Sequence, residues 1–193
     1  AAREHVLVWA AARDLDTTVD AAGNVVVRVP AQAGRERAPT VVLQSHLDMV
    51  CEREPDSPYD PREGRINVVV DGDWVLARGT TLGADNGIGV ALMLAVLENA
   101  DLEHGPLEAL FTVDEEAGMG GARGLATDVL QGCLMLNLDT EAWGEFYLGC
   151  AGGMDVNLRR SGTPEQLPAG WQAWRIELRG LRGGHSGVDI HEE

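Results

Sequence analysis

The sequence predicts an α/β fold in which a mixed, mainly parallel sheet is flanked by helices. Short apolar runs of strand length alternate with helical patterns as far as Asp139, and this alternation is typical of sheets whose parallel strands are joined by helices. Acidic or imidazole side chains follow several apolar runs directly, where each run ends. In open α/β sheets the carboxyl ends of the strands form the ligand-binding edge, so the pattern that predicts the fold also predicts a site.

The predicted helices and strands alternate as this fold requires. Apolar residues at helical spacing predict a helix over 3–16, a helix over 88–97 that is apolar nearly all round and therefore deeply packed, and a short helix ending near Leu125. Strands are predicted from β-branched or continuously apolar runs between turn residues: 25–29, 40–44, 107–113, 133–138, and a hairpin over 66–77 with an Asp71-Gly72 turn. The runs 40–44, 107–113 and 133–138 are expected to be buried.

The character of the sequence changes after Gly149. Residues 174–179 alternate between apolar and charged side chains, the pattern of a strand with one solvated face. We therefore expect a first domain over 1–156 and the beginning of a second over 157–193. Two strands alone cannot bury an apolar face, so the second domain is expected to be truncated.

Composition and charge argue against several classes of protein. The formal net charge of −16 disfavours binding to nucleic-acid backbones and to anionic membranes. No apolar run approaches the ~20 residues of a membrane span, and the charged N-terminus lacks the apolar stretch of a signal peptide. The three cysteines are scattered and form no CxxC pair, which fits a reducing compartment. We expect a cytoplasmic protein that binds neither nucleic acid nor membranes.

Four short clusters of acidic and imidazole residues stand at the ends of apolar runs: Ser45-His46-Leu47-Asp48, Gly83-Ala84-Asp85-Asn86, Asp114-Glu115-Glu116 and Asn137-Leu138-Asp139. If these ends converge, one imidazole and several carboxylates share a single cleft. An isolated buried carboxylate is very costly, so such a cleft requires a compensating cation. One His together with Asp and Glu suits zinc, with manganese or cobalt as competitors. The pattern therefore predicts a metallohydrolase.

Each cluster taken alone has a simpler explanation. Asp85 would make a good helix N-cap, Glu115-Glu116 is typical of a solvated pair, and Asp139 could merely cap a strand. An isolated His46-x-Asp48 is usually an ordinary polar loop, although alternation along an extended chain places both side chains on one side. One of them could then bind an ion while the other orients it. The four clusters rarely arise together, in this order, by chance.

The joint pattern resembles the M20 superfamily of dinuclear zinc aminopeptidases and carboxypeptidases. The resemblance is carried by LQSHLDMV at 43–50, GTTLGADNGIG at 79–89, TVDEEAGM at 112–119 and LNLDTE at 136–141. Within the superfamily the chain is most similar to the aminoacyl-histidine dipeptidases, or peptidase D, through GTTLGADNGIG, DEEAGM, GCAGG at 149–153 and GLRGGHSG at 180–187. This implies a zinc-peptidase-like catalytic domain over 1–156 and the first strands of an α+β lid domain over 157–193.

The resemblance also implies a set of protein ligands for two zinc ions, which cobalt or manganese could replace. His46 and Asp139 would be terminal ligands of one ion, and Asp85 would bridge both. Glu116 would bind the second ion together with a histidine near the C-terminus of the family's members. The chain ends at Glu193 without that histidine, so we expect a fragment of a longer enzyme.

Three further residues receive roles from the resemblance. Glu115 would be the general base that takes a proton from the attacking water and passes it to the leaving amine. Asp48 would orient His46. His185 would stabilise the oxyanion or hold substrate from the lid, sometimes across a dimer, although a structural role for it is equally open. The resemblance implies a homodimer.

The expected function is zinc-dependent hydrolysis of small peptides, in particular dipeptides of the Xaa-His type. One alternative is an N-acyl amino acid deacylase of the same superfamily. Another is a catalytically inactive, metal-binding fragment. Because a site that lacks one ligand binds its ion weakly, we expect about one tightly bound zinc per chain, self-association and little activity.

Overall fold

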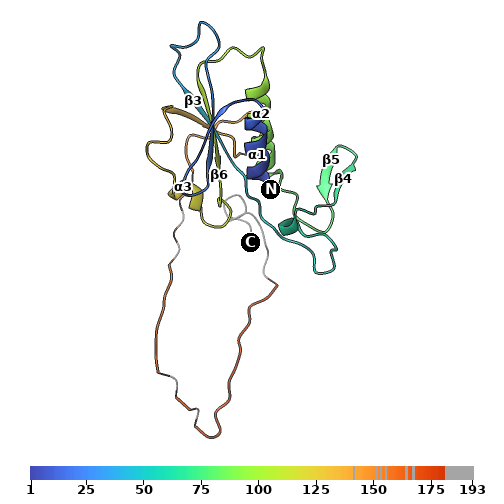
Figure 1. Cartoon of the computed structure of the whole chain (residues 1–193). Coiled ribbons are helices and arrows are strands. Elements are labelled where there is room, and N and C mark those ends of the chain that lie inside the picture. Colours follow the sequence, from blue (N-terminus) through green and yellow to red (C-terminus); the bar gives the residue numbers. More distant parts are fainter. Residues whose placement is uncertain are drawn as a thin grey trace. The chain divides into compact units, whose positions relative to one another are not determined.

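The computed structural model describes residues 1–140, 142–150, 152, 154, 156–163, 165–166 and 168–180. The chain divides into two compact units, Ala1–Ala142 and Trp143–Glu193. All helices and strands of the described residues lie in the first unit (Figure 1). The assignment of 157–193 to a lid domain stays a prediction.

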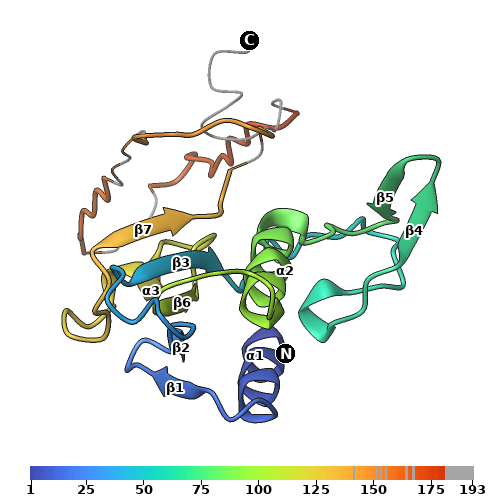
Figure 2. The same cartoon turned by 90° about the horizontal axis from the view of Figure 1, so that it is seen from above.

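A five-stranded sheet forms the centre of the first unit, in the order β1-β2-β6-β3-β7 (Figure 2). Its strands are β1 (Asp16–Val19), β2 (Val25–Val29), β3 (Val41–His46), β6 (Leu107–Thr112) and β7 (Leu134–Asn137). β6, β3 and β7 run parallel to one another, whereas β2 is antiparallel to β6 and β1 is antiparallel to β2. The predicted mixed α/β sheet is therefore confirmed, and the parallel strands end together on one edge.

Helices cover one face of this sheet. α1 (Ala2–Ala11) and α2 (Ala84–Glu98) pack through Val6, Trp9 and Met93 onto the buried residues of that face. The other face of the sheet is covered by the segment that contains the short helix α3 (Gly120–Arg123) and Val129. None of the helices among the described residues is long and apolar enough to cross a membrane.

Two elements are less buried than their sequences predict. α2 was expected to be packed all round, but Ile88 is 69% exposed and Leu92 is 50% exposed, because only one side of the helix faces the sheet. β7 was expected to be buried, yet all four of its residues are exposed. Among the described residues β7 pairs only with β3, and an edge strand without a covering layer exposes both of its faces.

The antiparallel hairpin does not belong to the main sheet. β4 (Val68–Asp71) and β5 (Trp74–Ala77) form a separate two-stranded sheet, joined by a two-residue turn in which Gly72 has a positive φ of 60°. We expected this hairpin to provide the antiparallel pairing in the main sheet, but β1 and β2 provide it instead. β1 was not predicted, and the helix expected over 3–16 overlaps its first residue, Asp16.

The strand expected over 174–179 is not formed. Among the described residues after Ala142 no strand is assigned. Alternation alone does not make a strand, because the backbone N–H and C=O groups need a partner strand.

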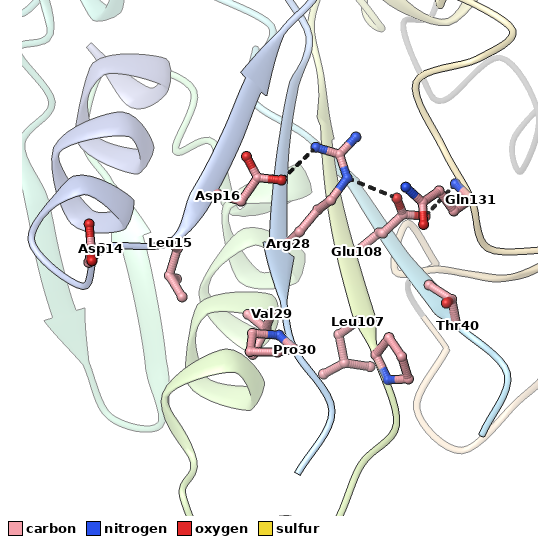
Figure 3. Close-up of a pocket in the computed structure, with 11 residues that line it drawn as sticks. Asp14, Leu15, Asp16, Arg28, Val29, Pro30, Thr40, Leu107, Glu108 and Gln131 are labelled. Carbon is pink, nitrogen blue, oxygen red and sulfur yellow. Dashed lines mark hydrogen bonds and ion pairs between the residues drawn. The ribbon is translucent and has the colours of Figure 1, made fainter. Parts of the chain in front are cut away.

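An ion pair between Arg28 of β2 and Glu108 of β6 joins these two strands to the segment that precedes β7. It lies near the amino ends of β3 and β6. Glu108 is almost fully buried and accepts hydrogen bonds from Nε of Arg28 at 3.2 Å and from the backbone N–H groups of Gln131 and Gly132 at 2.9 and 2.8 Å. Arg28 also donates to the carbonyl oxygen of Val129 at 2.6 Å. The pair borders a cavity of about 370 Å³ that lies at the opposite end of the strands from His46 (Figure 3).

We expect Glu108→Ala to lower the free energy of unfolding by about 3–5 kcal/mol, because it leaves two backbone N–H groups without an acceptor and removes one of the two carboxylates that pair with Arg28. The measurement is urea denaturation of the chain. The control is Arg35→Ala, which removes the exposed Arg35–Glu103 pair and should cost no more than about 1 kcal/mol. Equal losses in the two variants would show that the Glu108 network is not a source of stability.

Candidate metal centre

His46 lies at the carboxyl end of β3 and is only 1% exposed. It pairs in register with Thr112 at the end of the parallel strand β6, while β7 ends beside β3 on its other side. The residues that follow these strand ends, Glu115 and Asp139, are thereby brought to the same edge of the sheet. The predicted convergence of the clusters is therefore present in the fold.

The carboxylates surround the imidazole ring on its Nε2 side. Nε2 of His46 lies 3.0 Å from Oδ1 of Asp85, 3.6 Å from Oδ1 of Asp139 and 3.9 Å from Oε2 of Glu115. Two sets of three residues each have one possible ligand atom per residue, and within each set these atoms lie within 4.8 Å of one another. The first set is His46, Asp85 and Asp139, and the second is His46, Glu115 and Glu116. All five residues assigned to metal binding or proton transfer are thus brought together.

Main-chain contacts hold His46 in this orientation. Nδ1 lies 2.9 Å from the backbone carbonyl oxygen of Asp48, so we assign the ring proton to Nδ1, which leaves Nε2 free to act as a ligand. The Asp48 carboxylate is farther away, at 3.6 Å from Nδ1. Its Oδ2 accepts a hydrogen bond from the backbone N–H of Glu116 at 3.1 Å. Asp48 therefore contacts the imidazole through its carbonyl oxygen, and it contacts the loop that carries Glu115 and Glu116 through its carboxylate.

The pKa values of these groups show an excess of negative charge. Burial lowers the pKa of His46, but Asp139 above all, together with the Asp48 carbonyl and Asp85, raises it to about 9. Burial raises the pKa of Glu115 and of Glu116, and neighbouring carboxylates raise both further, against the opposing effect of His46. A cation is the favourable occupant of such a cluster. The nitrogen and oxygen donors, their spacing and this charge all fit a divalent metal ion such as zinc.

Side chains across the strand ends fix the relative positions of β7, β3 and β6. Nδ2 of Asn137 donates to Oε1 of Gln44 at 2.5 Å, and Nε2 of Gln44 donates to Oγ1 of Thr112 at 3.1 Å. Asn137 was named only as a member of its cluster, and Gln44 and Thr112 were given no role at the site. Their only signal in the sequence is a polar residue near the end of each apolar run.

The start of α2 is pressed closely against the strand ends. A Cβ on Gly89 would lie 1.9 Å from Oδ1 of Asn86, 2.6 Å from the carbonyl oxygen of Leu138 and 2.6 Å from Oγ of Ser45, so only glycine fits. Asn86, which precedes this close contact, is buried. The helix that follows Asp85 is therefore tightly located relative to β3. His185 lies outside the described residues, and its role stays a prediction.

Comparison with known proteins identifies relatives of this chain. The profile of peptidase family M20/M25/M40 matches residues 42–163. The cytosol non-specific dipeptidase of Escherichia coli (strain K12) is 48% identical over 188 residues, which span 97% of this chain and 39% of that protein. The uncharacterized protein YqjE of Bacillus subtilis (strain 168) is 32% identical over 131 residues, 66% of this chain and 32% of that protein.

Solved structures give the same result. The aminoacylhistidine dipeptidase of Vibrio alginolyticus superposes with a TM-score of 0.69 at 47% identity, over 72% of this chain and 28% of that one. A tripeptidase from Staphylococcus aureus superposes with a TM-score of 0.60 at 26% identity, over 72% of this chain and 37% of that one. The chain spans about two fifths or less of the length of the relatives and structures that it matches here.

We expect Asp85→Ala to weaken binding of zinc at this centre, because Oδ1 of Asp85 lies 3.0 Å from Nε2 of His46 and its carboxylate would offset the charge of a cation held there. The loss should exceed the ~10–100-fold that removal of a residue supporting a ligand costs. Calorimetric titration with zinc measures it. Asp73→Ala, which removes an exposed carboxylate from the β4–β5 turn, is the control. If the isotherm for Asp85→Ala matched that of the control, Asp85 would not be a metal ligand and would serve only at the start of α2.

Proposed function

Because the chain belongs to peptidase family M20/M25/M40, a family of metal-dependent peptidases, we propose that it forms the metal-binding part of a dipeptidase. The substrates we propose are dipeptides of the Xaa-His type, and the cofactor is a pair of zinc ions. The observation that carries this proposal is the convergence of His46, Asp85 and Asp139 with Glu115 and Glu116 at one sheet edge. The names of the Escherichia coli and Vibrio alginolyticus relatives, both dipeptidases, support the substrate class.

In this proposal the metal ligands divide between two ions. His46 and Asp139 would hold one ion, Glu116 would hold the other, and Asp85 would contribute a ligand to both. Zinc bound there supplies Lewis-acid polarisation of the scissile carbonyl and lowers the pKa of the attacking water. The two ligand groups share the His46 imidazole, so the residues assigned to the two ions lie next to one another.

Glu115 is the proposed general base. It lies 3.9 Å from Nε2 of His46, at the edge of the ligand cluster, and burial raises its pKa above the ordinary value for glutamate. A base works best when its pKa approaches the working pH. Glu115 takes a proton from the attacking water and delivers it to the leaving amine. Asp48 holds the neighbouring Glu116 through its backbone N–H, which fixes the pair of glutamates.

A cavity of about 190 Å³ opens beside Glu115 and Asp139. Leu110, Leu125 and Met135 give it an apolar lining, which suits one small side chain of a substrate. Small peptides are therefore the proposed partners, in a cytoplasmic protein that functions as a homodimer and binds neither nucleic acid nor membranes. The word cytosol in the name of the Escherichia coli relative supports the location.

Glu115→Gln should abolish turnover and leave metal content nearly intact, whereas Glu116→Gln should lower zinc stoichiometry. Loss of a general base typically costs ~10²–10⁴-fold in rate. Metal content and turnover are both measured on a chimera in which residues 1–193 replace the matching part of the Escherichia coli dipeptidase. If Glu115→Gln lost zinc while Glu116→Gln kept both zinc and rate, the two roles would be assigned wrongly.

The substrate class is tested with the same chimera. Alanyl-histidine should be hydrolysed with a kcat/KM at least about tenfold above that for N-acetylalanine, a difference of about 1.4 kcal/mol in transition-state binding. The reverse preference would favour the alternative, an N-acyl amino acid deacylase. Absence of turnover for both substrates in excess zinc would favour an inactive metal-binding fragment.

A further inference from the structure

We propose that Asn24, which lies between β1 and β2, is a positioning residue for the loop 113–121 that carries Glu115 and Glu116. Asn24 touches neither a proposed metal ligand nor the space beside it, so its effect reaches the site through the backbone of that loop. The inference rests on the proposed function, in which these two glutamates serve as base and ligand.

Asn24 is fully buried, and every polar hydrogen of its side-chain amide is used. Nδ2 donates to the carbonyl oxygen of Gly121 at 2.9 Å and to Oδ2 of Asp20 at 2.7 Å. Oδ1 accepts from the backbone N–H of Val113 at 3.2 Å. One side chain therefore binds both ends of the loop, at Val113 and at Gly121.

The two ends of the loop also bind each other. The backbone N–H of Gly121 donates to the carbonyl oxygen of Val113 at 2.9 Å. A Cβ on Gly121 would lie 2.3 Å from that oxygen and 2.4 Å from Oδ1 of Asn24. The neck of the loop, formed by Val113, Gly121 and Asn24, is thus too tight for any side chain at Gly121.

The backbone between these ends needs such support. Asp114 and Met119 have positive φ angles of 57° and 58°, a region that residues other than glycine rarely adopt and keep only where the surroundings fix it. The acidic part of the loop is held on its far side by Asp48, which accepts from the N–H of Glu116. Asn24 at the neck and Asp48 at the acidic part together determine where the glutamates lie.

The chemistry of the contact requires an amide. Aspartate at position 24 keeps the acceptor for Val113 but lacks both donors, so the buried carbonyl oxygen of Gly121 loses its partner. It also places a second carboxylate beside Asp20, whose Oδ1 already accepts from the backbone N–H groups of Gly23 and Asn24. Asn24→Asp therefore opens the neck of the loop with an almost isosteric change.

The test is a calorimetric zinc titration of Asn24→Asp in the 193-residue chain, with amide hydrogen exchange of 114–120 in parallel. Binding of the ion assigned to Glu116 should weaken ~10–100-fold, as for other residues that hold a ligand in place, while the ion at His46 and Asp139 keeps its affinity. Exchange of 114–120 should accelerate. Gly121→Ala, which disturbs the same neck from the other side, should give the same result and decides the matter if Asn24→Asp does not fold.

Glu108→Gln is the matched control. It is an equally isosteric exchange between a carboxylate and an amide, and it disturbs a buried hydrogen-bond network at the other end of β6. It should lower stability without changing the weaker zinc affinity or the exchange of 114–120. Unchanged weak-site binding and exchange in Asn24→Asp would overturn the inference. The inference would also be overturned if both zinc affinities fell in proportion to the loss of stability, because that result indicates a merely structural role. If the unmodified chain binds no zinc, the proposed function fails, and unchanged exchange of 114–120 in Asn24→Asp still overturns the positioning role.

Discussion

The accumulation of negative charge around one buried imidazole governs the organisation of this molecule. His46 has Asp85, Asp139 and Glu115 within 3.9 Å of its Nε2. The direction of each pKa follows from that arrangement, since His46 holds its proton more tightly and Glu115 resists losing its own. A divalent cation relieves this imbalance better than a single proton does, and the rest of the unit is arranged to keep these groups together in spite of their repulsion.

Several rigid contacts hold the repelling groups in place. The hydrogen bonds from Asn137 to Gln44 and from Gln44 to Thr112 lock the ends of β7, β3 and β6 against each other. The neck of the loop at Asn24 and the contact of Asp48 with Glu116 fix the acidic loop. Stability at the far end of the sheet comes from a different source, the Arg28–Glu108 network, so the site and the base of the sheet can be disturbed separately.

The sequence predicts best what depends on local pattern. β3 and β6 are continuous apolar runs and were predicted correctly, together with the polar residues that follow them. Exposure of β7 and of Ile88 on α2 was not predictable, because burial depends on which elements cover a surface and apolar runs look alike in either case. Asn24 carries no signal in the sequence beyond its place next to Gly23, just before β2. Its two partners in the loop, Val113 and Gly121, lie 89 and 97 positions away in the chain, and no local pattern records such a contact.

The position of zinc in crystals of the chain grown with the metal, determined from an anomalous difference map at the zinc edge, tests most directly whether this cluster is a metal centre. We expect a peak at about 2.0–2.1 Å from Nε2 of His46, with Asp85 and Asp139 as further ligands. A peak only at surface residues, with Nε2 of His46 still in direct contact with the Asp85 carboxylate, would contradict the claim that this cluster is a metal centre.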